Sequence, residues 1–183
     1  MIPVQPLSQH GRHLPQQPVD GRALRTVCGN FATGVTVITT GGPQDGAATT
    51  VNSFTSVSLD PPLVLFCLHR QSRLRPVLQR SRGFVVNFLT RSQEGLAWKF
   101  AGRESAQLTE VPHHRSTTGL PVLTEALAFL ECRLAEEYDG GDHAILVGEV
   151  TALGTSTEET DPLVFYKGAM RVLDTDVPTP SRR

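Results

Sequence analysis

The sequence predicts a mainly β protein, a closed β-barrel with short helices appended to it. About seven segments have the apolar runs or the apolar–polar alternation of strands, and few have helical spacing. Turn sequences such as GGPQDG and DGGD separate neighbouring strands and suit antiparallel links. A mostly antiparallel order of this kind favours a barrel over a doubly wound sheet.

The 183 residues suffice for one domain with a core and are few for two. Residues 1–19 are rich in Pro and Gln and lack periodicity, so we expect a flexible N-terminal tail. Residues 20–174 are expected to form the barrel domain, and residues 175–183 a polar C-terminal tail.

Three helices are expected where a capping residue precedes helical spacing. Asp20 and Ser72 each offer a side-chain oxygen to the free N–H groups of a first turn. Thr90 and Gln93 have the spacing of a capping box. The expected spans are residues 20–34, 72–81 and 90–102, the first and last of them ended by glycine.

The expected strands are bounded by turn residues. They cover residues 35–40, 49–59, 63–68, 84–89, 127–138 and 143–154, with two shorter ones in LVFYKG and AMRVL. The continuous apolar run LVLFCL predicts a buried strand. Residues 103–126 give few signals and are expected to be mostly loop.

A formal net charge of −1 and 19% charged residues give no long-range attraction to nucleic acid or to an anionic membrane. No apolar run has the length of a membrane span, and the N-terminus has no signal-peptide core, so we expect a cytoplasmic protein. The three cysteines, Cys28, Cys67 and Cys132, lie far apart among apolar neighbours and are expected to be buried free thiols.

Signatures of nucleophilic, phosphate-binding and Rossmann sites are missing from the sequence. His113 and His114 are neighbours with no further ligand at metal-binding spacing, so no metal site is expected there.

The segment TTVNSFTSVSLDPP, residues 49–62, carries hydroxyls and an amide where a core strand has Val or Ile. Strict alternation would place Thr50, Asn52, Ser56 and Ser58 on one face, interrupted only by Phe54. Such a face fits an exposed edge strand or the wall of a wet pocket for a ligand rich in heteroatoms, and composition alone leaves both open.

Three further features have both a structural and a functional interpretation. Arg73 and Arg75 follow the Ser72 cap, so they either face solvent or bind phosphate. His143 stands at the start of a strand after the DGGD turn, where it is a polar end residue or a ligand contact. The segment PLVFYKG is ordinary packing or an aromatic wall with a charge beside it.

Taken together, these features resemble the flavin reductase-like family with an FMN-binding split barrel, the reductase partners of two-component flavin-dependent monooxygenases. The resemblance covers roughly residues 22–173 and depends most on NSFTSVSLDPP together with GGDH. It implies FMN or FAD as the flavin, NADH or NADPH as the hydride donor, and a homodimer with the site near the interface.

The resemblance also implies a site. Its flavin-binding residues would be Ala48, Thr49, Thr50, Asn52, Ser53, Cys67, Leu68, His69, Ser72, Arg73, Lys99 and Phe100. Its nicotinamide side would be His143, Phe165, Tyr166, Lys167 and Gly168. Hydride transfer between stacked rings needs alignment and no protein nucleophile, acid or base, which agrees with the missing catalytic motifs.

The sequence is also compatible with two other functions. One is a barrel enzyme that holds FMN tightly and acts directly on another small molecule. The other is a non-enzymatic flavin- or haem-binding module, against which GGDH and PLVFYKG count.

Overall fold

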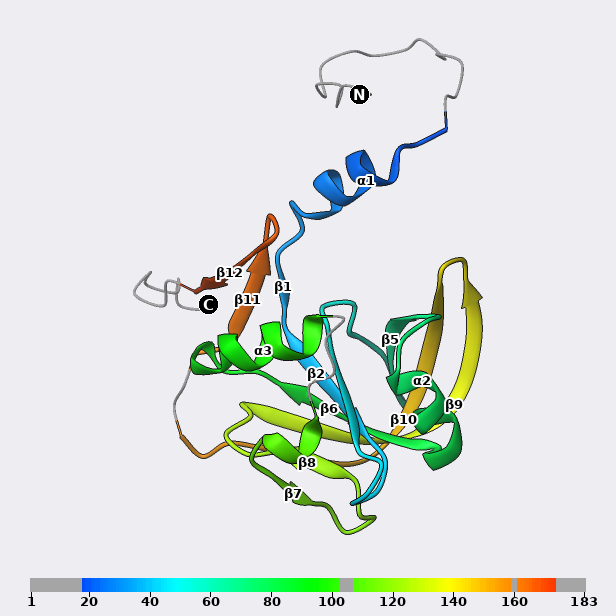
Figure 1. Ribbon diagram of the computed structural model, residues 1–183, viewed down its shortest axis with the longest axis vertical. Helices are drawn as coiled ribbons and strands as arrows, with labels where there is room; N and C mark the ends of the chain where they lie inside the picture. The colour runs from blue at the N-terminus through cyan, green and yellow to red at the C-terminus, as the bar shows by residue number, and fades with distance from the viewer. Residues whose placement is uncertain (1–17, 103–106, 159–160, 174–183) are drawn as a thin grey trace.

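The computed structural model describes residues 18–102, 107–158 and 161–173 (Figure 1). Both predicted tails fall almost wholly outside these ranges. The fold is mainly β, as predicted, and its largest unit is a seven-stranded antiparallel sheet in the order β3-β2-β6-β9-β10-β5-β4. Its strands are β2 (Thr36–Thr40), β3 (Ala47–Val51), β4 (Thr55–Leu59), β5 (Pro62–His69), β6 (Gly83–Phe88), β9 (Ala128–Gly140) and β10 (His143–Thr155).

Two smaller sheets flank this one. The first contains β1 (Thr33–Gly34), β11 (Leu163–Tyr166) and β12 (Ala169–Val172). The second is the hairpin of β7 (His113–Arg115) and β8 (Pro121–Leu123), in a region where the sequence predicts mostly loop. His113 and His114 therefore lie on a strand, and the His113 ring is 2.8 Å from the Val111 carbonyl oxygen.

Two apolar clusters form the core. One contains Phe66 and Phe84, fully buried and edge to face at 5.2 Å, with α2 (Leu74–Ser81) contributing Leu74 and Leu78. The other contains Ala97 and Phe100 of α3 (Glu94–Ala101) packed against residues of β2 and β11. These clusters fix α2 and α3 against the sheet, beside the ends of β3 and β5.

The helix caps agree in part with the prediction. The carboxylate of Asp20 accepts the Ala23 N–H at 3.2 Å and begins α1 (Gly21–Cys28), but α1 ends before Gly29, well short of Gly34. Helix α2 begins at Leu74, so Ser72 is not its cap, although its hydroxyl accepts the Leu74 N–H at 3.4 Å.

The Thr90–Gln93 capping box is confirmed. It begins the 3-10 turn η1 (Arg91–Gln93), which leads into α3. A second 3-10 turn, η2 (Leu108–Glu110), comes before β7. No helix in the described ranges is both long and apolar enough to cross a membrane.

The predicted strand over residues 49–59 is wrong as one element. The chain forms β3, leaves the strand at Asn52, and forms β4 at the opposite edge of the large sheet. Ser53 accounts for the break, because its hydroxyl accepts the Cys67 N–H at 2.9 Å and donates to the Cys67 carbonyl at 3.2 Å. One side chain thus replaces the backbone ladder at the point where the chain passes from β3 to the β4–β5 hairpin.

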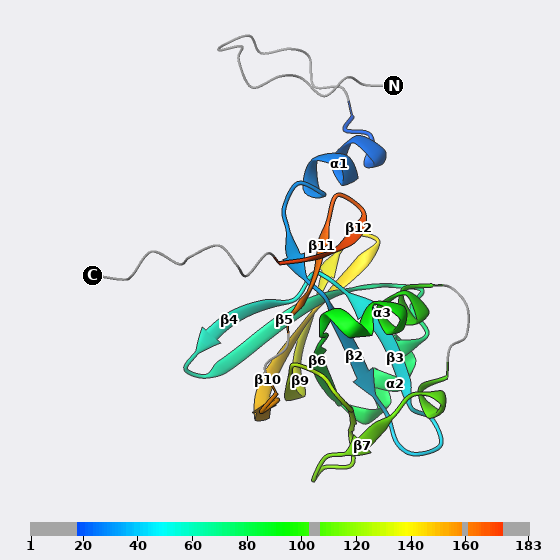
Figure 2. The same ribbon diagram turned by 90° about the vertical axis from the view of Figure 1, so that its left-hand side faces the viewer.

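The β4–β5 hairpin extends away from the rest of the barrel (Figure 2). Val57 and Leu59 are 49% and 91% exposed, so the apolar side chains of β4 are not buried. Strand β5 alternates between buried and half-buried residues, which corrects the prediction of a wholly buried strand. Of the cysteines, Cys132 is buried as predicted, Cys67 is half-buried and Cys28 is exposed.

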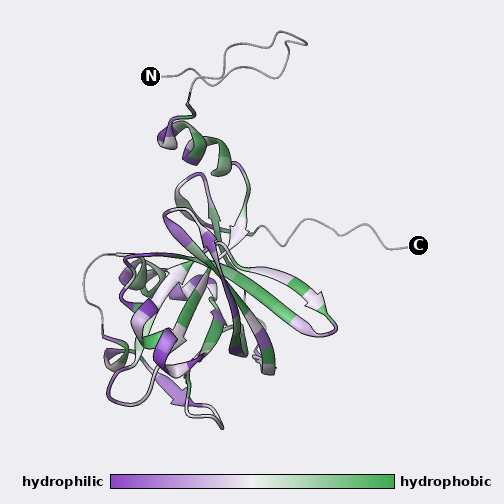
Figure 3. Ribbon diagram, turned by 90° about the vertical axis from the view of Figure 1, so that its right-hand side faces the viewer, coloured by the Kyte–Doolittle hydropathy of each residue, from purple (hydrophilic) through white to green (hydrophobic). Residues whose placement is uncertain are grey.

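Helix α1 stands outside the barrel beside the β11–β12 hairpin (Figures 1 and 2). None of its residues is buried, and its ribbon carries hydrophobic segments in the open (Figure 3). Leu24, Val27 and Phe31 are 54%, 52% and 77% exposed. The Lys167 N–H donates to the Gly29 carbonyl at 2.9 Å and ties the hairpin to the end of this helix.

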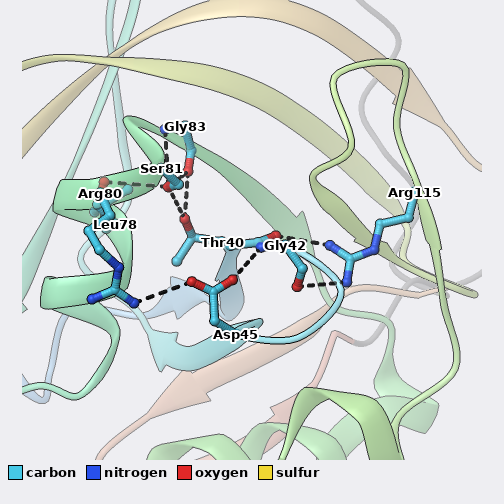
Figure 4. A network of polar contacts seen from close by, with 9 residues as sticks. Thr40, Gly42, Asp45, Leu78, Arg80, Ser81, Gly83 and Arg115 are labelled. Carbon is cyan, nitrogen blue, oxygen red and sulfur yellow. Dashed lines mark hydrogen bonds and ion pairs between the residues drawn. The ribbon is translucent and has the colours of Figure 1, made fainter.

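Polar contacts fix the turn between β2 and β3 (Figure 4). The Asp45 carboxylate accepts the Gly42 N–H at 2.7 Å and an Arg80 N–H at 3.2 Å. These contacts, the backbone N–H first, lower the pKa of Asp45. Arg115 donates to the carbonyls of Gly41 and Gly42 from the other side. The turn is therefore anchored to both α2 and β7, and it sets the position of β3.

Candidate functional site

A cavity of about 300 Å³ opens where β3, β5, α3 and the start of β10 meet, a size at the lower end of small-molecule sites. Its wall contains many of the residues predicted from the sequence. They are Thr49, Thr50, Asn52, Ser53, Cys67, Leu68, His69, Ser72 and His143, and Val51 and Ala101 complete the lining.

Strand register brings the two histidines together. In the antiparallel pairing of β5 with β10, His69 faces His143 and Leu68 faces Ala144. The two imidazole rings lie edge to face, with centroids 5.2 Å apart. Residues from the flavin-binding set and from the nicotinamide set of the prediction therefore share one wall.

The hydroxyl-rich segment has two roles in this wall. The Thr50 hydroxyl donates to the Ala97 carbonyl of α3 at 2.7 Å, and the Ser53 hydroxyl holds Cys67, so these two groups join the elements around the cavity. Within the described residues, the side chains of Thr49 and Asn52 have no hydrogen-bond partner. The polar groups of Thr49 and Asn52 are thus free to bind a ligand. The hydroxyls of Thr50 and Ser53 instead join the elements that surround the cavity.

The turn before β10 is locked to the end of β5. The Arg70 guanidinium donates to the Gly141 carbonyl and to the Asp139 carboxylate, each at 2.7 Å. The Arg70 N–H donates to the Asp142 carbonyl at 3.0 Å. These contacts hold His143 in place beside the cavity.

The two rings have different hydrogen-bond partners. His143 Nδ1 lies 2.7 Å from the Asp142 carboxylate, and this contact is the main reason why the pKa of Asp142 is lowered. His69 Nδ1 accepts the Gln71 N–H at 3.1 Å, so neutral His69 carries its proton on Nε2. In each ring, Nε2 is the nitrogen left for a ligand.

Four predicted flavin-binding residues lie outside the cavity wall. Phe100 is 5% exposed and belongs to the core, and Lys99 pairs with Glu110 at 2.9 Å. Ala48 packs against the second core cluster. Arg73 is exposed at the start of α2, next to the lining residue Ser72.

Arg75 is not available for a phosphate. Its guanidinium lies 2.5 Å from the Glu137 carboxylate, and this contact lowers the pKa of Glu137. The prediction of a phosphate-binding pair therefore reduces to Arg73, with Ser72 beside it.

The predicted nicotinamide residues divide into two places. His143 lines the cavity, whereas Phe165, Tyr166, Lys167 and Gly168 lie on the β11–β12 hairpin outside it. The Lys167 ammonium stands 5.2 Å from the centroid of the Tyr166 ring. These four residues therefore do not line the cavity of their own chain.

Val51 and Ala101 line the cavity but were not predicted from the sequence. Both are small or medium apolar residues, so no polar signal marks them. Ala101 ends α3 and lines the cavity with a methyl group.

The cavity combines polar groups without internal partners, two imidazoles and apolar side chains. This set of donors and acceptors fits a planar heterocycle with a polar edge and a polyhydroxyl chain, as the flavin mononucleotide unit has.

Comparison with known proteins agrees with this chemistry. The sequence matches the family model of the flavin reductase like domain over residues 28–174. The reductase subunit HsaB of a flavin-dependent monooxygenase from Rhodococcus jostii is 39% identical over 168 residues, 91% of this chain and 86% of that protein. The FMN reductase (NADH) SmoA from Agrobacterium fabrum is 39% identical over 150 residues, 82% of this chain and 84% of that protein.

A solved structure of a flavin reductase is also similar to this chain. The NADH:FAD oxidoreductase SgcE6 from Streptomyces globisporus, in complex with NAD and FAD fragments, has a TM-score of 0.80 and 36% identity. The match covers 89% of this chain and 100% of that chain.

Proposed function

The chain belongs to the flavin reductase-like family, and from this premise we propose that it is an NADH:flavin oxidoreductase. It takes FMN or FAD as a substrate, reduces it by hydride transfer from NADH, and releases it reduced. The observation that carries the proposal is the meeting of Thr49, Asn52, His69 and His143 in one cavity.

The flavin occupies the cavity in this proposal. Thr49 and Asn52 hydrogen-bond its polar edge and ribityl chain, and Cys67 and Leu68 contact the ring. Ser72 and Arg73 at the start of α2 take the phosphate. His143 supports the nicotinamide, oriented by the Asp142 carboxylate. The chain contributes alignment and exclusion of water, and the hydride moves between the two bound rings.

The protein works as a homodimer in this proposal. Helix α1 has no buried residue, and it exposes Leu24 and Val27, with the exposed Phe31 just after its end. A helix this short is marginal in water without a partner surface. The hairpin residues 165–168 lie outside the cavity of their own chain, so we assign them to the nicotinamide bound in the other copy.

Reduced flavin leaves the site and is used by a separate flavin-dependent monooxygenase. Relatives named as reductase subunits of such enzymes, from Rhodococcus jostii for example, support this assignment. The proposed location is the cytoplasm, because free cysteines, one of them the exposed Cys28, suit a reducing compartment.

NADH oxidation with and without added FMN or FAD tests the function. We expect activity that depends on added flavin and saturates with it. Activity from the purified protein without added flavin would instead indicate a tightly bound FMN acting on another molecule. No oxidation under either condition would contradict the enzyme assignment.

Replacing Leu24 by glutamate is expected to convert the dimer to a monomer, because a charge would then be buried in an apolar contact. Light scattering on a size-exclusion column measures the mass. Leu153→Glu on β10 is the control, since Leu153 is 69% exposed and lies on another part of the surface. A dimer that persists in Leu24→Glu would show that α1 is not the contact.

Asn52→Ala is expected to raise the KM for flavin about 5- to 100-fold, by the loss of one or two hydrogen bonds to the ligand, and to leave the midpoint of thermal unfolding unchanged. Ser53→Ala is the matched comparison. Its hydroxyl is used inside the protein, so this change should lower the free energy of unfolding by about 1–3 kcal/mol as well. Equal destabilisation by the two changes would contradict these separate roles.

A further inference from the structure

Trp98, the only tryptophan of the chain, is 47% exposed on α3. Ala97 and Phe100 turn to the core, so Trp98 lies on the solvent side of the helix. Glu94, Trp98 and Ala101 are spaced by four and three residues, which places them in one stripe along that side. Ala101 lines the cavity. The stripe therefore leads from the rim of the cavity onto the outer surface.

The indole of Trp98 is oriented by one hydrogen bond. Its Nε1–H donates to the Glu94 carboxylate at 3.2 Å, one turn earlier in the helix. Trp98 belongs to neither apolar cluster, so core packing does not account for it. An exposed aromatic ring that a hydrogen bond orients offers a stacking surface to a ligand.

The size of the cavity leaves part of a dinucleotide outside. About 300 Å³ is at the lower end of the range for small-molecule sites, enough for a ring system with a short chain. FAD and NADH each carry an adenosine diphosphate portion beyond their reactive ring. That portion must lie on the surface near the rim, and Trp98 is one helical turn from the rim residue Ala101.

We propose that Trp98 stacks the adenine ring of a dinucleotide whose reactive half occupies the cavity. The dinucleotide is FAD or NADH, and adenine is the chemistry that they share. Glu94 holds the indole, and its second carboxylate oxygen is left to accept the exocyclic amino group of the base. This inference rests on the proposed reductase function and adds a specificity-determining contact to it.

Three measurements on the full-length protein test the proposal. Fluorescence of Trp98 is recorded during titration with AMP, and saturable quenching is expected. Kd values for FAD and FMN are measured for wild type, Trp98→Leu and Trp98→Phe. The KM for NADH is measured in the same three proteins with FMN as acceptor. Thermal unfolding and size-exclusion chromatography show whether each variant is folded and keeps its oligomeric state.

Trp98→Leu removes the aromatic face and is expected to weaken binding of the dinucleotide about 5- to 100-fold, while Trp98→Phe retains most of the affinity. If the Kd for FAD rises relative to that for FMN, the adenine belongs to the flavin. If the KM for NADH rises, the adenine belongs to the nicotinamide dinucleotide. Either outcome supports the proposal.

Unchanged FAD and NADH constants in an active Trp98→Leu enzyme would overturn the stacking proposal and leave the reductase function intact. So would an equal loss in Trp98→Phe, or a change of oligomeric state without a change in either constant, because Trp98 would then be a structural or subunit contact. A wild-type protein without reductase activity would contradict the proposed function, and AMP quenching would still decide whether adenine binds at Trp98.

Discussion

Replacing His143 by alanine is expected to lower kcat/KM for NADH by about 10- to 100-fold, while the flavin affinity changes much less. The ring is held against His69 at 5.2 Å and against the Asp142 carboxylate at 2.7 Å, so it is a rigid wall for a second ring beside the flavin. Its removal leaves the nicotinamide free to turn away from the geometry of hydride transfer.

Steady-state assays with NADH varied at saturating FMN measure this loss, and flavin titration measures the affinity. His114→Ala is the control, because His114 is an exposed histidine on β7 outside this cavity. A His143→Ala enzyme with the wild-type kcat/KM would show that the nicotinamide side has been assigned to the wrong residue.

Gly148→Ala is expected to lower the free energy of unfolding by about 1–3 kcal/mol, the usual cost of overpacking a core. A methyl group at this position of β10 would clash first with Phe84 Cζ, and it would lie 2.8 Å from Phe84 Cε1 and 3.0 Å from Cys132 Cβ. Phe84 is fully buried and packs edge to face against Phe66, so a shift of its ring would disturb the core.

Urea denaturation followed by circular dichroism measures the change. Gly95→Ala in α3 is the matched control, since no atom lies within 4 Å of the added methyl group. There the same substitution is expected to raise the stability by about 0.5–1 kcal/mol, because alanine favours a helix more than glycine does. Equal effects at the two positions would contradict the packing argument.

The parts of the fold that depend on local sequence were predictable. The DGGD turn and the apolar runs around it predict the β9–β10 hairpin, and Thr90 with Gln93 predicts the capping box. The break at Asn52 was not predictable. Strand-forming Thr, Val and Phe stand on both sides of Asn52 and Ser53, and tertiary pairing decides that β3 joins β2 while β4 joins β5.

The site was predictable where its residues carry polar groups in a recognisable segment, as Asn52 and His143 do. It was not predictable for Ala101, which contributes only its small size. Nor does the sequence indicate that Arg75 binds Glu137, a residue 62 positions away. Such pairing depends on the placement of α2 against β9, which no local pattern encodes.

The large sheet has β3 at one edge and β4 at the other, and a single segment containing Ser53 crosses between them beside the cavity. At that seam no continuous ladder joins the two edges, so side chains rather than strand pairing hold the walls together. A flavin in contact with both walls would bridge the two edges of the sheet. The free energy of flavin binding would then add to the stability of the folded state. The enzyme would resist heat and proteases better when flavin is abundant. Supply of the substrate would in this way regulate the lifetime of the enzyme as well as its turnover.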